Sequence, residues 1–280
     1  MFFFNKIHTI AASGILAGAA DHHSHILPGV DDGVETIDEA LRILATYEAL
    51  GIKELWLTPH IMEDIPNTPQ KLAARFEELK AAYNGNITLH LAAEYMIDNH
   101  LHKLLQNHCP SCVRGASNTV AEGDRTIVSL ETNNSPSFQK SEYPQEEGVS
   151  PLLPIGTAGK HILVETSYYN APIRMRETLQ QIKSLGYHPL LAHPERYMYL
   201  DNAEYRKLHN EGVKFQLNLA SLGGGYGSVV KKKALWLLNS GLYSVGGTDL
   251  HCEEAIGFIT KCKLSKKEMA QVELLLQNNL

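Results

Sequence analysis

Hydrophobic residues follow two patterns that alternate along the chain. Short apolar runs of five to eight residues are separated by longer stretches in which apolar positions recur every three or four residues. The first pattern indicates buried strands, and the second indicates helices with one apolar face. The runs predict strands at residues 52–58, 87–94, 161–165, 187–193, 213–218 and 242–249. The stretches between them predict helices at residues 37–50, 69–83, 174–185, 203–211, 229–239 and 265–276.

The alternation of strand and helix is typical of a parallel sheet or a barrel, and the predicted fold class is therefore α/β. Thr36 and Glu39 predict a capping box at the start of the first helix. Glycines that commonly end helices support the same boundaries. They are Gly51, Gly186, Gly212 and Gly241.

The 280 residues are enough for one large barrel or for two ordinary domains. Because the strand–helix rhythm continues to the end of the chain, we predict a single domain over residues 1–280. Residues 107–150 interrupt the rhythm and are rich in Ser, Asn, Glu, Gly and Pro. We interpret them as an irregular insertion within the domain.

The amino-acid composition limits the classes of protein to which this chain can belong. Hydrophobic residues make up 44% and charged residues 20%, as in a soluble globular protein. The formal net charge of −6 argues against nucleic acid as a partner. No apolar run is long enough to span a membrane, so we expect no stable membrane insertion. The oligomeric state stays open.

The start of the chain resembles a short signal peptide with small residues before Asp21. Cleavage after Ala20 would remove the strand that should hold His23 and His25, so we expect the segment to be retained. The four cysteines are too few for a disulfide scaffold. The predicted location is therefore the cytoplasm.

Side chains able to bind metal recur at the ends of the predicted strands, where the active sites of β/α barrels are built. His23 and His25 lie two positions apart on an extended segment, so both imidazoles face the same side, whereas His22 faces away. Asp21 is expected to orient a histidine. Imidazoles and carboxylates without thiolates suit Zn, Mn or Fe(II), and the chain is therefore interpreted as a metallohydrolase.

Five segments in a fixed order carry a family resemblance. They are D-x-H-S-H-I-L-P-G-V-D-D-G at 21–33, T-P-H at 58–60, A-A-E-Y-M-I-D at 92–98, H-P-E-R at 193–196 and G-T-D-L-H at 247–251. Together they resemble the polymerase and histidinol phosphatase (PHP) superfamily. The most similar branch comprises bacterial metal-dependent protein-tyrosine phosphatases that serve capsule and exopolysaccharide synthesis.

The resemblance implies a distorted (β/α)7 TIM-like barrel of the PHP type that holds two or three divalent ions. Manganese is expected, with iron, zinc and magnesium as alternatives. Asp32 fits the family motif better than Asp31, although the sequence leaves that choice open. The implied metal ligands are His23, His25, Asp32, His60, Glu94, Glu165, His193, Asp249 and His251.

The implied reaction is hydrolysis of phosphotyrosine on a protein, with a bacterial tyrosine kinase that controls polysaccharide synthesis as the expected partner. Divalent ions would activate water as the nucleophile, and Glu165 is suited to bridge two ions. Arg196 would stabilise the phosphoryl group through its planar fork of donors. His25 or a metal-bound water would protonate the leaving phenol. The predicted catalytic residues are Arg196, His25 and Asp249.

The sequence leaves several alternatives open. A phosphatase of small molecules such as histidinol phosphate would share the metal ligands, and a non-catalytic PHP regulatory module would lack some of them. A nuclease or polymerase-associated module is disfavoured by the acidic charge.

Cys109 and Arg114 nearly match the loop of thiol phosphatases, but only four residues separate them and the glycines are missing. Residues 252–257 contain no arginine, which puts a second phosphate clamp in doubt.

Overall fold

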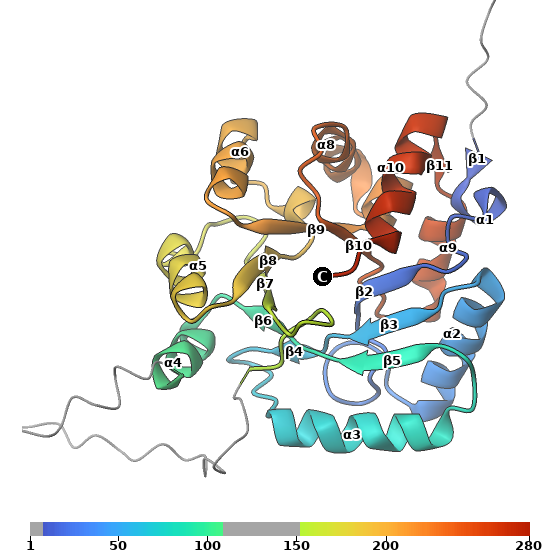
Figure 1. Cartoon of the computed structure of the whole chain (residues 1–280), viewed down its shortest axis with the longest axis horizontal. Coiled ribbons are helices and arrows are strands. Elements are labelled where there is room, and N and C mark those ends of the chain that lie inside the picture. Colours follow the sequence, from blue (N-terminus) through green and yellow to red (C-terminus); the bar gives the residue numbers. More distant parts are fainter. Residues whose placement is uncertain (1–7, 109–151) are drawn as a thin grey trace, which may run out of the picture.

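Parallel strands form the centre of the molecule, and helices lie around them (Figure 1). The computed structural model describes residues 8–108 and 152–280. One sheet of six strands has the order β10 (Val245–Gly247), β9 (Lys214–Asn218), β8 (His188–Leu191), β7 (His161–Glu165), β6 (Glu94–Met96) and β4 (His60–Ile61). A second sheet has the order β2 (Ala20–Ser24), β3 (Glu54–Leu57) and β5 (Thr88–Leu91).

Every strand pair in these two sheets is parallel, which confirms the predicted α/β class with parallel sheets. A separate antiparallel pair joins β1 (His8–Thr9) to β11 (Lys263–Leu264). The longer helices are α2 (Ile37–Leu50), α3 (Pro69–Ala82), α4 (Asn99–Asn107), α5 (Met175–Ser184), α6 (Asn202–Asn210), α8 (Gly227–Asn239) and α10 (Lys266–Gln277). The short helices are α1 (Ile10–Ser13), α7 (Leu219–Gly223), α9 (Ile256–Thr260), η1 (Pro194–Arg196) and η2 (Glu253–Ala255).

Strand β2 brings the two ends of the described chain together. On one side it pairs with β3. On the other side the backbone N–H of Asp249 donates to the carbonyl of His23 at 2.7 Å, and that of His25 donates to the carbonyl of Leu250 at 2.9 Å. The residues that follow β10 are therefore held beside the residues that end β2.

Most of the predicted elements are confirmed, but two strands are interrupted. The strand predicted at 87–94 is observed as β5 and β6, because Ala92 and Ala93 leave the ladder and donate to the carbonyls of Leu57 and Leu153. The strand predicted at 52–58 is likewise followed by β4, after Pro59, which has no N–H to donate. Both interruptions occur where predicted metal ligands follow.

The predicted capping box of α2 is only half formed. Thr36 accepts the N–H of Glu39 at 3.2 Å, but the carboxylate of Glu39 accepts from Glu35 instead of Thr36. A complete box is found at α10, between Ser265 and Glu268. The predicted helix-ending glycines all have positive φ angles of 67–88°.

Helix α2 shows how the outer helices are held. Ala40, Ile43, Leu44 and Tyr47 recur at helical spacing and are buried, and Ile43 and Leu44 are fully buried. Burial of each of these larger side chains contributes roughly 1.5–3 kcal/mol. The apolar face of α2 therefore fixes this helix against the strands that carry the histidines.

Some of the expectations concern residues that the structure does not describe. The predicted insertion at 107–150 lies outside the described residues, except for Asn107 and His108. Cys109 also lies outside the described residues. The same holds for the first seven residues of the segment that resembles a signal peptide. None of the helices in the described ranges is long and apolar enough to cross a membrane.

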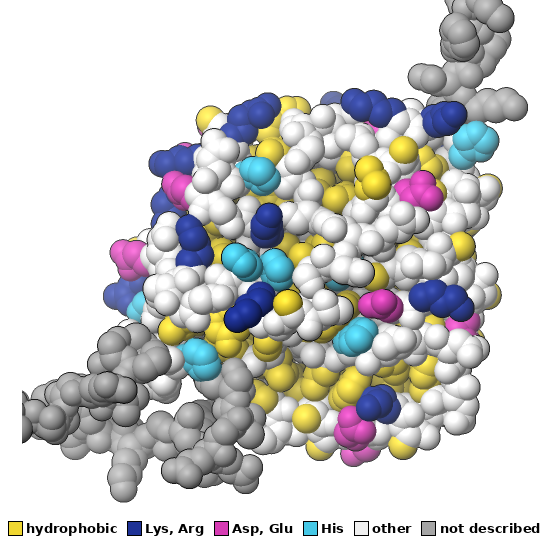
Figure 2. Space-filling model, viewed as in Figure 1, with side chains coloured by type: hydrophobic (Ala, Val, Ile, Leu, Met, Phe, Trp, Pro, Cys, Tyr) yellow, Lys and Arg dark blue, Asp and Glu magenta, His cyan; other side chains and the backbone are white. Residues whose placement is uncertain are grey.

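The surface charges are mixed on the face shown in Figure 2. Lys and Arg side chains alternate there with Asp and Glu side chains, and several histidines lie near the middle. On this face the described residues form no continuous basic stripe, which agrees with the negative net charge.

Candidate metal centre

The structure brings all of the predicted metal ligands to one end of the parallel strands. His23 lies near the end of β2 and His25 follows it, His60 begins β4, Glu94 begins β6 and Glu165 ends β7. His193 follows β8, while Asp249 and His251 follow β10. Three overlapping groups have atoms close enough to share an ion: His25–Asp32–His60–His251, His23–His25–Glu94–Asp249 and His60–Glu94–Glu165.

Glu94 lies at the centre of these groups. Its Oε2 atom is 3.2 Å from Nε2 of His23, 3.3 Å from Nε2 of His25 and 3.3 Å from Nδ1 of His60. The two Nε2 atoms of His23 and His25 are themselves only 3.1 Å apart. Three imidazoles and one carboxylate therefore converge on a volume of the size that one metal ion occupies.

Asp249 closes the opposite side of the same volume. Its Oδ1 atom is 3.4 Å from Nε2 of His23 and 3.6 Å from Nδ1 of His251. His193 approaches from β8, with Nε2 3.2 Å from Oε1 of Glu94 and 3.7 Å from Oε2 of Glu165. His193 belongs to none of the three groups, although it borders two of them.

The two adjacent aspartates have different positions. Asp32 Oδ1 lies 3.4 Å from Nε2 of His60 and 3.6 Å from Nε2 of His251, at the exposed edge of the cluster. The Asp31 carboxylate lies 2.8 Å from Nδ1 of His25 and accepts the backbone N–H of His60. Asp31 thus has the orienting position that the sequence had assigned to Asp21, and Asp32 has the position of a candidate ligand.

The chemistry of this donor set fits divalent cations. Buried atoms without a hydrogen-bond partner include Nδ1 of His60, Oε2 of Glu94 and Nδ1 of His193. Burial and the negative charges of Glu94 and Asp249 raise the pKa of Glu165 well above its ordinary value. A positive ion among these carboxylates would relieve this repulsion and would supply partners for unpaired atoms.

Backbone strain marks two of the predicted ligands. His193 has a φ angle of 31° and Asp249 a φ angle of 52°, and in the described part of the chain these are the non-glycine residues with positive φ. Such conformations are costly for residues with a Cβ atom and cluster at functional sites. Each of the two residues lies where the chain turns away from a strand end and projects its side chain into the cluster.

Strand β9 supplies no predicted metal ligand, but it contributes two buried amides that the sequence reasoning missed. Oε1 of Gln216 lies 3.0 Å from Nδ1 of His23 and accepts the backbone N–H of His193 at 3.1 Å. Nδ2 of Asn218 donates to Oδ2 of Asp249 at 2.9 Å. Gln216 and Asn218 lie two positions apart on the strand, and this alternation was the available signal.

Arg196 lies at the edge of the cluster between two aromatic rings. Its guanidinium carbon is 4.2 Å from the ring centre of Tyr168 and 4.3 Å from that of Tyr226. One nitrogen donates to Oδ2 of Asp249 at 2.8 Å, and the neighbouring carboxylates hold the pKa of Arg196 above its ordinary value despite burial. The neighbouring Glu195 has other partners: its carboxylate accepts from the hydroxyl of Tyr243 and from the backbone N–H of Asn218.

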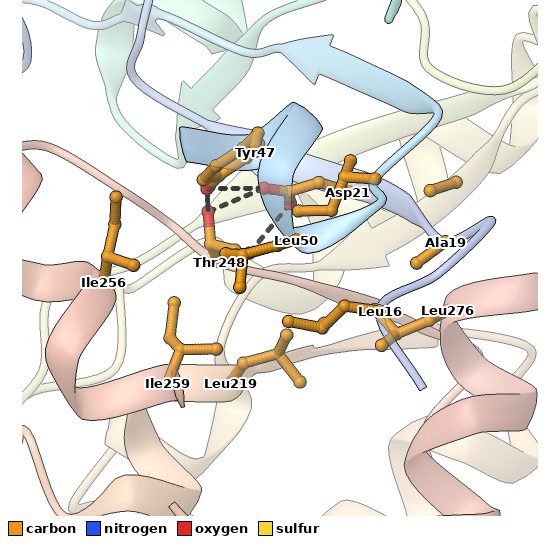
Figure 3. Close-up of a pocket in the computed structure, with 12 residues that line it drawn as sticks. Leu16, Ala19, Asp21, Tyr47, Leu50, Leu219, Thr248, Ile256, Ile259 and Leu276 are labelled. Carbon is orange, nitrogen blue, oxygen red and sulfur yellow. Dashed lines mark hydrogen bonds between the residues drawn. The ribbon is translucent and has the colours of Figure 1, made fainter. Parts of the chain in front are cut away.

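Asp21 has a structural partner set of its own. Its carboxylate accepts from the hydroxyl of Thr248 at 2.7 Å and from that of Tyr47 at 3.1 Å (Figure 3). These groups border a small apolar cavity near Leu16. Asp21 also accepts the backbone N–H of His23 at 3.2 Å, so the expected contact with a histidine is made through the backbone of His23. His22 faces away from the cluster, as predicted, and its Nδ1 approaches the carbonyl of Gly246 at 3.3 Å.

A cleft of about 380 Å³ opens above the cluster. Its floor is formed by the candidate ligands and Arg196, and its wall is formed by less polar residues from the α7–α9 region. The wall residues are Ala220, Gly225, Tyr226, Cys252, Ala255 and Phe258. The cleft is therefore open to a ligand that has one anionic end and one apolar part.

The chain is similar in sequence to proteins of capsular polysaccharide synthesis. The family described as capsular polysaccharide synthesis, CpsB/CapC, matches residues 19–126 and 154–272. Tyrosine-protein phosphatase CpsB of Streptococcus pneumoniae is 25% identical over 239 residues, with 82% of each chain covered. The putative tyrosine-protein phosphatase CapC of Staphylococcus aureus is 24% identical over 237 residues, which cover 82% of this chain and 76% of that protein.

A solved structure supports the fold. It comes from a study of YwqE from Bacillus subtilis and CpsB from Streptococcus pneumoniae, described as unique metal-dependent tyrosine phosphatases. The TM-score is 0.66 at 19% sequence identity, and the match covers 93% of this chain and 95% of the other. At this identity the likeness establishes the arrangement of the backbone.

Proposed function

This chain belongs to the capsular polysaccharide synthesis CpsB/CapC family, and we propose that it is a metal-dependent protein-tyrosine phosphatase. The observation that carries the proposal is the convergence of buried imidazoles and carboxylates below a cleft that Arg196 borders. This set of groups matches the needs of a phosphate monoester, whose negative charge must be neutralised while water attacks it.

The predicted ligands are assigned here as residues that would hold two or three divalent ions. When bound, such ions lower the pKa of water and neutralise charge on the phosphoryl oxygens. Glu94 belongs to two of the three groups, which suits a carboxylate shared by two ions, and Glu165 shares the third group with it. Manganese is the proposed metal, with iron, zinc and magnesium as alternatives, because oxygen and imidazole donors suit these ions.

Arg196 is proposed to bind the phosphoryl group. The two tyrosine rings pack against its guanidinium group, and its two terminal nitrogens donate to Asp249 and to the hydroxyl of Tyr168, so the position of its donor edge is fixed. The contact with Asp249 holds this edge beside the candidate ligands. His25 and Asp249 remain the other proposed catalytic residues. Nδ1 of His25 contacts the Asp31 carboxylate, which fixes the orientation of the ring.

We also propose that the strands close into a distorted (β/α)7 barrel within a single domain. The interrupted pairs β3/β4 and β5/β6 would each count as one strand, which gives seven with β2 and β7 to β10. The hydrogen bonds between β2 and the residues after β10 support closure. In this arrangement the cluster lies at the mouth where β/α barrels carry their active sites.

The proposed substrate is a phosphotyrosine protein, and a bacterial tyrosine kinase that controls polysaccharide synthesis is the proposed partner. The cytoplasmic location expected from the sequence also remains a prediction. The alternative enzymatic function is a phosphatase of small molecules, because histidinol phosphate would bind at the same candidate metal ligands. The test below includes this compound.

The proposal is tested by assaying the purified chain on a phosphotyrosine peptide and on histidinol phosphate, with and without a chelator, alongside metal analysis. We expect the peptide to be hydrolysed in preference, with activity lost on chelation and restored by manganese. Asp249→Ala and His193→Ala should abolish turnover in folded protein. Turnover that survives both the chelator and these substitutions would contradict the metal mechanism.

Two further variants separate this mechanism from others. Arg196→Lys keeps the charge but loses the planar fork, and we expect kcat/KM to fall about 100-fold. Cys109→Ser should leave kcat/KM unchanged, because no thiolate is needed. Loss of activity in the cysteine variant would instead support thiol catalysis.

A further inference from the structure

The cleft has two chemically different parts, and the proposed phosphatase chemistry uses only one. The floor is charged and holds the candidate ligands. The wall carries two aromatic side chains, Tyr226 and Phe258, of which 38% and 50% of the surface is exposed. Few large hydrophobic side chains in the described part of the chain are this exposed, and these two share the cleft.

Phe258 is held in place by the close approach of two backbones. It lies in α9, and its carbonyl packs against Gly223 at the end of α7 so closely that a Cβ atom there would lie 2.0 Å from the carbonyl oxygen. A Cβ atom at Gly225 would lie 3.4 Å from Cγ of Phe258. The backbone that carries the ring is therefore held by a close contact with α7, which limits where the ring can lie.

Tyr226 connects this wall to the floor. One face of its ring lies over the Arg196 guanidinium, and its hydroxyl accepts from Asn218 at 3.2 Å. The same hydroxyl is 3.5 Å from Oδ2 of Asp249. Tyr226 thus joins the wall to the residue that would bind the phosphoryl group, and Phe258 lines the same cleft as both.

We propose that Tyr226 and Phe258 bind the phenyl ring of the substrate and give the site its preference for aryl over alkyl phosphate esters. The inference rests on the proposed phosphatase function and adds the residues that would select the leaving group. A phosphate ester of tyrosine places a flat apolar ring next to its anionic end. An aromatic contact of this kind corresponds to about two- to tenfold in binding.

The direct test is calorimetric binding of two stable phosphonates to the manganese-loaded protein. Phenylphosphonate carries the ring, and methylphosphonate offers the same anionic group without it. We expect the wild type to bind phenylphosphonate about two- to tenfold more tightly. Phe258→Ala should remove this difference and leave methylphosphonate binding unchanged, whereas Phe258→Tyr should preserve it because the ring remains.

A matched control is Leu274→Ala on α10, which removes an exposed apolar side chain that does not line the cleft. This variant should keep the wild-type ratio. If Phe258→Ala also keeps it, or if the wild type shows no preference, the aromatic wall is not the ring site. If the wild type binds neither phosphonate, the phosphate site itself is absent, and both this inference and the proposed function are overturned.

Discussion

The side-chain oxygen of Gln216 lies 3.0 Å from Nδ1 of His23. The orientation of this amide is fixed, because Oε1 also accepts the backbone N–H of His193 and Nε2 donates to the carbonyl of Leu217. An amide oxygen can only accept, so Nδ1 of His23 must carry the proton. Nε2 of His23 is therefore the ring nitrogen left to bind a metal, and it is directed at Glu94.

Replacing Gln216 with Leu should therefore weaken metal binding about 10- to 100-fold. The substitution keeps the side-chain size but removes the acceptor of both His23 and the His193 backbone. Competition with a metal-sensitive chelator measures the affinity. Gln271→Leu on α10 is the control, because its amide contacts only the carbonyl of Leu238. Equal metal affinity in both variants would show that Gln216 has no role in orienting His23.

Asn218→Asp is a sharper test of the second amide of β9. The new carboxylate can still accept the N–H of Ala220 and thus cap α7, but it replaces the donor to Asp249 with a negative charge. We expect kcat/KM to fall at least about tenfold at pH 8. Repulsion between the new carboxylate and Asp249 favours protonation of one of the two groups. The loss of kcat/KM should therefore be smaller at pH 6 than at pH 8. A defect that is independent of pH would contradict this electrostatic explanation.

Thr248→Val tests the contact that joins β10 to β2. The substitution keeps the shape of the side chain but removes the hydroxyl that donates to the buried carboxylate of Asp21 at 2.7 Å. Loss of this donor should lower the free energy of unfolding by about 1–3 kcal/mol. Denaturant unfolding of the metal-free chain measures it. Thr46→Val on α2 removes only a hydroxyl that donates to Arg42 within the helix and should change stability much less.

His161 at the start of β7 should make the fold sensitive to acid. Burial and the positive charges of His188, Lys214 and His22 lower the pKa of His161 to about 4. In the unfolded chain the imidazole takes up a proton near pH 6.5, so stability should fall as the pH drops from 6.5 towards 4.

His161→Gln should reduce this loss by on the order of 1 kcal/mol between pH 7 and 5, since partial exposure screens the effect. Chemical unfolding at the two pH values measures the difference. His8→Gln in the exposed β1 is the control. If both variants lose stability as the wild type does, His161 is not responsible for the acid sensitivity.

Regular elements with strong local signals could be predicted from the sequence. The predicted bounds of α2 and β7 are those observed, because Thr36 and Gly51 limit the helix and a continuous apolar run marks the strand. The short helices α7 and α9 were missed, since five residues give too few turns for a periodic pattern. Contacts with the rest of the fold determine whether such short segments become helical.

The candidate ligands could be predicted because His and acidic residues at strand ends carry a recognisable chemistry. Gln216 and Asn218 were missed because amides inside a strand are usually interpreted as ordinary polar positions. Their partners come from β2, β8 and β10, which are distant in sequence. The contact between Asp21 and Thr248 was missed for the same reason, because the two residues are 227 positions apart.

The joining of β2 to the residues after β10 has a consequence during synthesis of the protein. His23 leaves the ribosome early, whereas Asp249, whose N–H binds the carbonyl of His23, leaves it more than 200 residues later. The nascent chain must therefore hold its first histidines without their final neighbours for most of translation. Ion capture in the native geometry follows completion of the chain, and a product truncated before β10 would expose these imidazoles to solvent.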